Sequence, residues 1–307
     1  MKKLPLKSPM LALALLPLLL AACGGSDDKD SGSNSNNPAD PQAGATQKSK
    51  HPPIPDTGVA PPNDEEKAAF NASKISIEPY NALNGAKPAP FLITAEDGTP
   101  TRGFDGENAQ RDFSKLPSGF TSVKGTLTLV KNDNNGGTNP TPTPPKKDDK
   151  DNQAVTLRSY QGFRSGVYIA HSDQPGVFVR TADYGVWSKA EQLPSSGRAT
   201  YHGVAFDRAD QGTLTYHVDF AARTGEGQID GLPRYDGTIN LRRAGFQTRD
   251  DGSIGIRDGA ADSRYKGSLT YSTGFAGAGA EELTGYVVNA ADAEIVGFHG
   301  TRGEISQ

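Results

Sequence analysis

The clearest pattern along the chain is a strict alternation of apolar and polar residues from 213 to 220. The apolar positions are Leu214, Tyr216, Val218 and Phe220, and the polar positions between them are Thr215, His217 and Asp219. A period of two places these sets on opposite faces, which is typical of an antiparallel strand with one buried face.

Comparable runs recur along the second half of the chain, and turn signals such as Asp236-Gly237 and Asp258-Gly259 separate many of them. The runs cover residues 166–170, 177–181, 199–206, 237–241, 266–272, 282–289 and 294–299. About eight short strands without a long helical segment indicate a closed antiparallel barrel or a sandwich. We favour the barrel because closure leaves no free edge. The predicted fold class is all-β, with an eight-stranded antiparallel soluble β-barrel over residues 153–307.

Upstream of the barrel, residues 64–130 are expected to form a smaller β-rich domain. Its apolar residues stand in short alternating runs, and the run 124–130 predicts a strand. Residues 131–152 are rich in Pro, Asn and mixed charges, which indicates a linker or a long exposed loop. Residues 23–63 have almost nothing apolar to bury, so we expect a disordered tether there.

Residues 1–22 have the layout of a secretory signal peptide, with Lys2, Lys3 and Lys7 ahead of an apolar run. The segment Leu20-Ala21-Ala22-Cys23 resembles the bacterial lipobox. That resemblance implies cleavage before Cys23, acylation of Cys23 and stable anchoring in lipid through several acyl chains. Glycines rather than Asp follow Cys23, so the expected location is the outer membrane.

Composition narrows the chemistry that the chain can perform. The formal net charge is −4 with a pI near 5.8, and loss of the signal peptide changes it to −7, so nothing indicates a nucleic-acid partner. One Cys excludes an intrachain disulfide and a Cys-based metal site. The chain has no G-x-S-x-G, H-E-x-x-H or Walker A motif, so we expect neither an enzyme nor a cofactor.

The histidines offer one candidate site. The complete set is His51, His171, His202, His217 and His299. His202 and His217 are candidates for cross-strand neighbours on the polar face, where they could form a weak metal or haem-edge site with Asp219. The competing interpretation is two histidines that simply face solvent.

Basic residues offer a second candidate. From Gln153 onward the chain has 13 Arg against 2 Lys, and Arg is enriched at protein interfaces where Lys is depleted. The predicted partner-binding arginines are Arg234, Arg242, Arg243, Arg249, Arg257 and Arg264. A genomic bias from Lys to Arg explains the same count. Trp187 and Tyr184 are candidates for exposed anchors or for packing between domains.

Two stretches resemble a known family. Residues 193–206 and 212–229 resemble the C-terminal barrel of the factor H-binding protein family. The ending at 274–285 and 296–300 looks like one shared more widely, by transferrin-binding protein B barrels and the heparin-binding antigen. The resemblance implies an eight-stranded barrel with an N-terminal β-rich partner domain, exported to the cell surface by dedicated lipoprotein machinery. In the glycine-rich ending, Glu281 or Glu282 is expected to accept backbone N–H bonds.

The resemblance leaves three functional hypotheses. The first is capture of a host macromolecule, most simply complement factor H, which would reduce complement attack. The second is nutrient capture, with haemoglobin, haem or transferrin as the ligand of a partner transporter. The third is a structural or adhesive role, with polyanion binding disfavoured by the acidic charge. Fold alone does not choose among these ligands.

Overall fold

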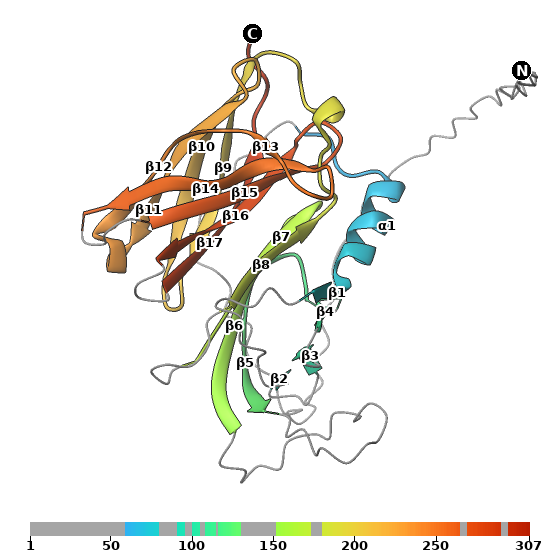
Figure 1. Ribbon diagram of the computed structural model, residues 1–307, viewed down its shortest axis with the longest axis vertical. Coiled ribbons are helices and arrows are strands. Elements are labelled where there is room, and N and C mark those ends of the chain that lie inside the picture. Colours follow the sequence, from blue (N-terminus) through green and yellow to red (C-terminus); the bar gives the residue numbers. More distant parts are fainter. Residues whose placement is uncertain are drawn as a thin grey trace, which may run out of the picture. The chain divides into compact units, whose positions relative to one another are not determined.

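The computed structural model describes residues 59–79, 91–95, 100–104, 108–114, 116–129, 152–172, 180–264, 269–289 and 294–307. All of them belong to one compact unit, Thr46–Gln307. They form two antiparallel sheets and one α-helix (Figure 1). The signal peptide, Cys23, nearly all of the tether and the linker at 131–151 lie outside the described residues.

The second sheet closes into a barrel. Its strands are β9 (Arg198–Phe206), β10 (Gln211–Asp219), β11 (Thr224–Leu232), β12 (Gly237–Gly245), β14 (Ile254–Ser263), β15 (Leu269–Ala276), β16 (Glu282–Asn289) and β17 (Glu294–Arg302). Neighbours pair in the order β12-β11-β10-β9-β17-β16-β15-β14, and a further β12–β14 pairing joins the two ends. The short β13 (Gln247–Thr248) pairs only with β14 among the described strands. The predicted eight-stranded antiparallel barrel is confirmed.

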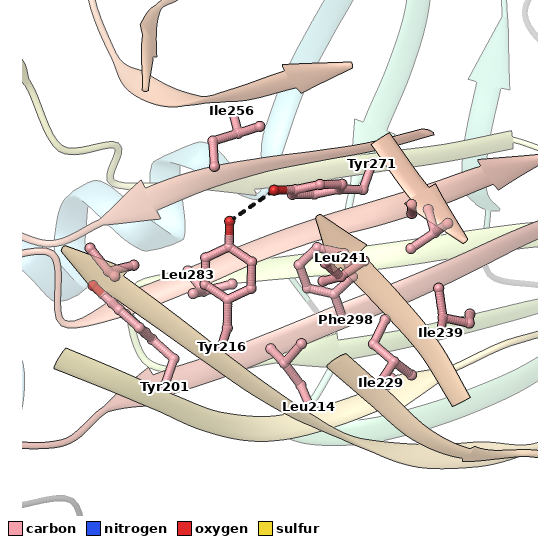
Figure 2. Close-up of a cluster of buried hydrophobic side chains, with 14 of the residues drawn as sticks. Tyr201, Leu214, Tyr216, Ile229, Ile239, Leu241, Ile256, Tyr271, Leu283 and Phe298 are labelled. Carbon is pink, nitrogen blue, oxygen red and sulfur yellow. Dashed lines mark hydrogen bonds between the residues drawn. The ribbon is translucent and has the colours of Figure 1, made fainter. Parts of the chain in front are cut away.

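The barrel interior is filled by apolar and aromatic side chains (Figure 2). In β10 the predicted alternation holds, since Leu214, Tyr216 and Val218 are buried while Thr213 and His217 are exposed. Buried tyrosine hydroxyls need hydrogen-bond partners, and Tyr271 donates to the carbonyl of Arg242 at 2.8 Å. The interior is therefore a packed core.

One position in the barrel requires glycine because two strands approach each other closely there. Gly203 in β9 faces Gly300 in β17, and a Cβ at Gly203 would overlap the carbonyl oxygen of His299. Only glycine lets the backbones pack at this point of the β9–β17 seam.

The first sheet contains eight strands in the order β1-β4-β3-β2-β5-β6-β7-β8. They are β1 (Ile75–Pro79), β2 (Phe91–Ala95), β3 (Pro100–Phe104), β4 (Asn108–Asp112), β5 (Gly119–Leu129), β6 (Asn152–Gln161), β7 (Ser165–Ser172) and β8 (Arg180–Gly185). The predicted strand at 124–130 lies largely within β5.

One part of the strand assignment is wrong. The run 166–170 lies in β7 of the first sheet, not in the barrel, and the change of sheet falls between Gly185 and Arg198 rather than near Gln153. The barrel instead contains β11 and β14, and neither of these strands was among the predicted runs. Both strands contain register shifts, and a bulge interrupts the alternation that marks a strand in the sequence.

A helix precedes the first sheet. In α1 (Asp64–Ser73) the Asn63 side chain accepts from the N–H of Glu66, whose carboxylate in turn accepts from the N–H of Asn63. This capping box fixes the start of the helix. Phe70 is buried and stacks on Tyr184, within a cluster that includes Phe113 and Tyr168. None of the helices in the described part is long and apolar enough to cross a membrane.

Candidate functional site

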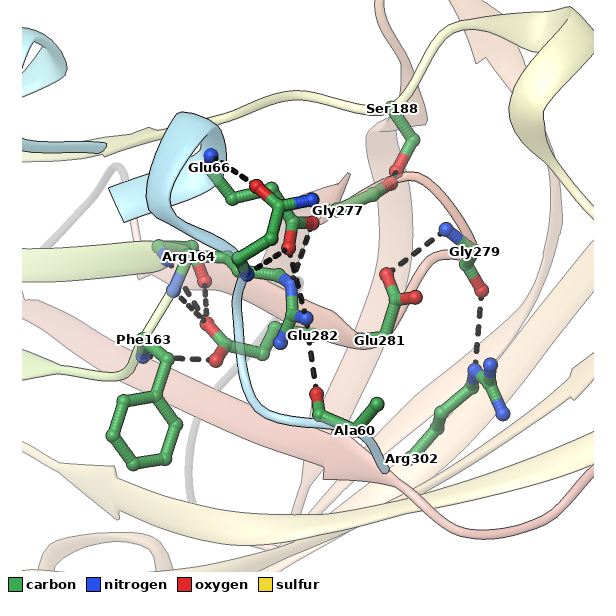
Figure 3. Close-up of polar contacts among 12 residues, drawn as sticks. Ala60, Glu66, Phe163, Arg164, Ser188, Gly277, Gly279, Glu281, Glu282 and Arg302 are labelled. Carbon is green, nitrogen blue, oxygen red and sulfur yellow. Dashed lines mark hydrogen bonds and ion pairs between the residues drawn. The ribbon is translucent and has the colours of Figure 1, made fainter. Parts of the chain in front are cut away.

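The turn between β6 and β7 is joined to the barrel by one buried carboxylate, Glu282 at the start of β16 (Figure 3). Glu282 Oε1 accepts from the N–H of Phe163 at 2.9 Å. Glu282 Oε2 accepts from the N–H groups of Arg164 and Ser165 at 3.0 and 2.9 Å and from the Ser165 hydroxyl at 3.0 Å. His299 Nε2 lies 3.1 Å from the same oxygen. The Glu282 carboxylate thus binds three backbone N–H groups and one hydroxyl of the turn.

The electrostatics of Glu282 follow from these contacts. Burial raises the pKa of a carboxyl, but the hydrogen bond and charge of His299 and the backbone N–H groups of Arg164 and Phe163 outweigh burial, so the pKa of Glu282 is lowered. The expectation that Glu281 or Glu282 accepts backbone N–H bonds is confirmed for both, because Glu281 Oε2 accepts from Gly279 at 2.9 Å. Both glutamates therefore stabilise the local backbone.

Arg164 ties α1 to the same turn. Its Nε donates to Glu66 Oε1 at 2.9 Å and its guanidinium donates to the Ala60 carbonyl at 3.0 Å. The Arg164 side chain is only 4% exposed. Burial raises the pKa of Glu66, but hydrogen bonds from Arg164 and the N–H of Asn63 lower it further, so the net shift is downward. Arg164 therefore joins the start of α1 to the turn, in addition to the packing of Phe70.

Phe163, between these two anchored positions, behaves differently. Its side chain is 62% exposed, and it is the one large hydrophobic residue that stands out as exposed in the described part of the chain. Figure 3 shows the ring pointing away from the polar contacts that hold its backbone. Sequence analysis missed Phe163, because a single Phe in a turn carries no periodic signal.

An open groove of about 550 Å³ lies on the outer surface of the barrel. Strands β9 to β12 and the segment after β17 line it, and its charged and titratable members are Arg198, His202, His217, Asp219, Glu226, Arg243 and Glu304. Arg198 Nε donates to Asp219 Oδ2 at 3.0 Å. The N–H of Ala222 and then Arg198 lower the pKa of Asp219.

The two histidines of the predicted pair both line this groove. His202 lies opposite Thr215 and His217 lies opposite Thr200, so they are on adjacent strands and two positions apart in register. Both are exposed, and His217 Nδ1 lies 3.0 Å from the Thr200 hydroxyl. Within the described ranges there is no group of three His, Cys, Asp or Glu side chains that could hold a metal.

The other histidines have different settings. His171 and His299 are buried, and His51 lies outside the described residues. The metal or haem-edge hypothesis therefore has no set of ligands in the part of the chain that the structure describes.

The six predicted arginines lie in different settings. Arg242 pairs with Asp262 at 2.6 Å and Arg264 pairs with Asp236 at 3.3 Å, both on the exposed surface. Arg243 lines the groove and donates to the Thr224 hydroxyl at 3.0 Å.

Arg249 lies over the Trp187 ring, 5.2 Å from its centroid, and pairs with Asp183 at 3.3 Å. Arg257 is exposed and Arg234 is half-buried in a 3₁₀ turn. Trp187 forms an isolated bridge to Ala276 of the barrel, and Tyr184 is buried in the first sheet's core. Both aromatic residues therefore pack within the fold.

Taken together, the described part of the chain is a two-sheet β protein built around a barrel with a filled interior and a polar groove outside. Residues 191–287 match the family model described as factor H binding protein, C-terminal. The predicted resemblance is confirmed for this region of the chain. The match begins just before β9 and ends within β16, so it covers most of the barrel.

Two solved structures were found to resemble this chain. A transferrin binding protein B double mutant from Haemophilus parasuis Hp5 shares 14% identity over 69% of this chain with a TM-score of 0.36. This chain spans 44% of that protein's length. The haemoglobin receptor HpuA from Kingella denitrificans, without ligand, shares 13% identity over 75% of this chain and 91% of its own, with a TM-score of 0.37.

Proposed function

We propose that this chain is a lipid-anchored, surface-exposed protein of the bacterial outer membrane that binds a host macromolecule without catalysis, and that this macromolecule is complement factor H. The observation that carries the proposal is the match of residues 191–287 to the factor H binding protein C-terminal domain. Bound factor H would reduce complement attack on the cell.

The form of the barrel supports binding at its surface. Its interior is closed by continuous strand pairing and filled by side chains, among them Tyr216, Tyr271 and Phe298. A filled barrel has no internal space for a small ligand. The outer groove and the exposed Phe163 are the features of the described surface that fit a macromolecular partner.

The location rests on the sequence. The lipobox-like Leu20-Ala21-Ala22-Cys23 supports acylation of Cys23, transfer by surface lipoprotein export machinery and display outside the outer membrane. Intact mass of the purified native chain tests this. We expect loss of residues 1–22 and added acyl mass, and Cys23→Ala should abolish both.

Partner identity is tested with the soluble chain from Gly24 to Gln307 immobilised on a sensor surface. Purified factor H, haemoglobin and transferrin are passed over it separately, at low and high salt. We expect saturable binding of factor H alone. Binding of haemoglobin or transferrin in its place would replace complement evasion with nutrient capture, which was the alternative hypothesis from the sequence.

A further inference from the structure

The exposed aromatic ring of Phe163 is carried on an unusually constrained turn. Gly162 N–H donates to the Ser165 carbonyl at 2.8 Å, which closes the turn between β6 and β7. A Cβ on Gly162 would overlap His299 Nε2, so the backbone has no room to shift toward the barrel. With Glu282 binding the N–H groups of Phe163, Arg164 and Ser165, the turn is fixed on both sides.

A rigid backbone under an exposed aromatic ring is suited to binding. Aromatic residues are enriched in the cores of protein interfaces, and a group that is already held in place loses little conformational entropy on association. The fold leaves Phe163 exposed although its neighbour Arg164 is almost completely buried. The backbone that carries the exposed ring is therefore preorganised.

Strand register places this turn beside the groove. Glu282, which holds the turn, lies opposite Thr301 in β17, and Thr301 lies opposite His202 in β9. Directly opposed residues in an antiparallel sheet share a face. Two strand spacings correspond to about 10 Å. The backbone under the Phe163 turn and the edge of the groove at His202 are thus neighbours on the outer face of the barrel.

The carboxylates in the groove outnumber its arginines by one, with Asp219, Glu226 and Glu304 against Arg198 and Arg243. Arg198 is paired with Asp219, whereas Arg243 donates to the neutral Thr224 hydroxyl and keeps its charge. The exposed carboxylates of Glu226 and Glu304 have no hydrogen bond or ion pair with any described residue. Complementary charge steers association between proteins, so this groove favours basic side chains on a partner.

We propose that Phe163 and the groove, from its near edge at His202 and Glu304 to Glu226 two strands further on, make one docking surface for a folded protein, which receives Phe163 in an apolar pocket and presents Lys or Arg to the two glutamates. The proposal rests on the proposed function, and factor H is the partner that it tests. Phe163 supplies most of the affinity, and the glutamates supply association rate and salt dependence.

The test measures factor H binding to the Gly24–Gln307 chain and to three variants by surface plasmon resonance. We expect Phe163→Ser to weaken binding about 30-fold or more and Phe163→Tyr to stay close to the parent. The double variant Glu226→Gln/Glu304→Gln should slow association several-fold and flatten its salt dependence. The matched charge control is Asp250→Asn, an exposed carboxylate outside the groove, which should change neither.

Each outcome separates the two proposals. If the parent chain binds factor H and Phe163→Ser binds equally well, the docking surface is wrong and the proposed function stands. If the parent chain does not bind factor H, the proposed function fails and the docking surface fails with it. Thermal unfolding of Phe163→Ser should match the parent, because an exposed side chain contributes little to folding.

Two other occupants of the surface, a second copy of this chain and a lipid membrane, are tested in parallel. Sedimentation of the parent chain and Phe163→Ser reports self-association, and flotation with phosphatidylglycerol vesicles reports lipid contact. A dimer or vesicle binding that requires Phe163 would overturn the assignment to a folded partner.

Discussion

The barrel interior and the junction at Glu282 are held together in opposite ways. Inside the barrel, many apolar side chains are buried together. Removing any one of them loses only a part of the total stabilisation that burial provides. At the junction, the turn that carries Phe163 depends on one carboxylate, and the polar contact to α1 depends on Arg164. The difference teaches that a core truncation should act on the barrel as a whole, whereas loss of one carboxylate should act on a single turn.

Removing the carboxylate should give the largest effect. In Glu282→Ala, the buried N–H groups of Arg164 and Ser165, the part-buried N–H of Phe163 and the buried His299 lose their acceptor. Breaking a buried, hydrogen-bonded charged contact costs about 3–5 kcal/mol, and urea denaturation should show that loss in the free energy of unfolding.

The control for this prediction is Glu281→Ala. Glu281 is half-buried and accepts from the N–H of Gly279 only among the described contacts to its carboxylate. An equal loss of stability in both variants would contradict the special role of Glu282 and make the junction no different from its surroundings.

A core truncation in the barrel should cost a similar or slightly smaller amount but act elsewhere. Leu214→Ala removes a side chain that is 1% exposed from the packed interior, and such truncations cost about 2–5 kcal/mol. Hydrogen exchange is the discriminating measurement. The N–H groups of Phe163 to Ser165 should stay protected in Leu214→Ala, and rapid exchange there would show that the junction depends on the barrel core.

Part of the barrel could be predicted from the sequence because β10 obeys a simple rule. One face of β10 is buried, so its apolar residues recur with a period of two. The bulged β11 and β14 break that rule and were missed. The run in β7 is buried on both faces, and pairing partners, which a local pattern does not contain, put β7 and β10 in different sheets.

Helix α1 could have been found from its own residues. Asn63 followed by Glu66 is a capping-box signature, although the short helix has few apolar positions. The junction was beyond prediction, because Glu282 and Phe163 meet across about 120 residues of chain. The contribution of Glu226 and Glu304 to the groove was equally hidden, since they come from β11 and from the segment after β17.

Arg164→Ala should have a smaller effect, confined to the helix. The variant removes the hydrogen bonds to Glu66 and the Ala60 carbonyl, and hydrogen bonds to charged groups contribute about 1.5–3 kcal/mol. We expect faster hydrogen exchange in α1 with the barrel unchanged. The control is Lys67→Ala, whose pair with Asp64 is exposed, and faster exchange in that variant would assign the effect to the helix itself.

The smallest predicted effect is an acid transition at the junction. Because the folded pKa of Glu282 lies below its ordinary value of about 4.3, its charge stabilises the fold fully above that value. As the pH falls through the folded pKa, the unfolded chain binds more protons and this stability is lost. The pKa of Glu66 is lowered as well.

Urea midpoints of the parent chain should therefore fall from pH 7 to pH 3, and the midpoints of Glu282→Gln should start lower but fall less. The effect is smaller than that of Glu282→Ala because a protonated carboxyl still accepts hydrogen bonds, and parallel curves for the parent and Glu282→Gln would assign the acid response to other carboxylates.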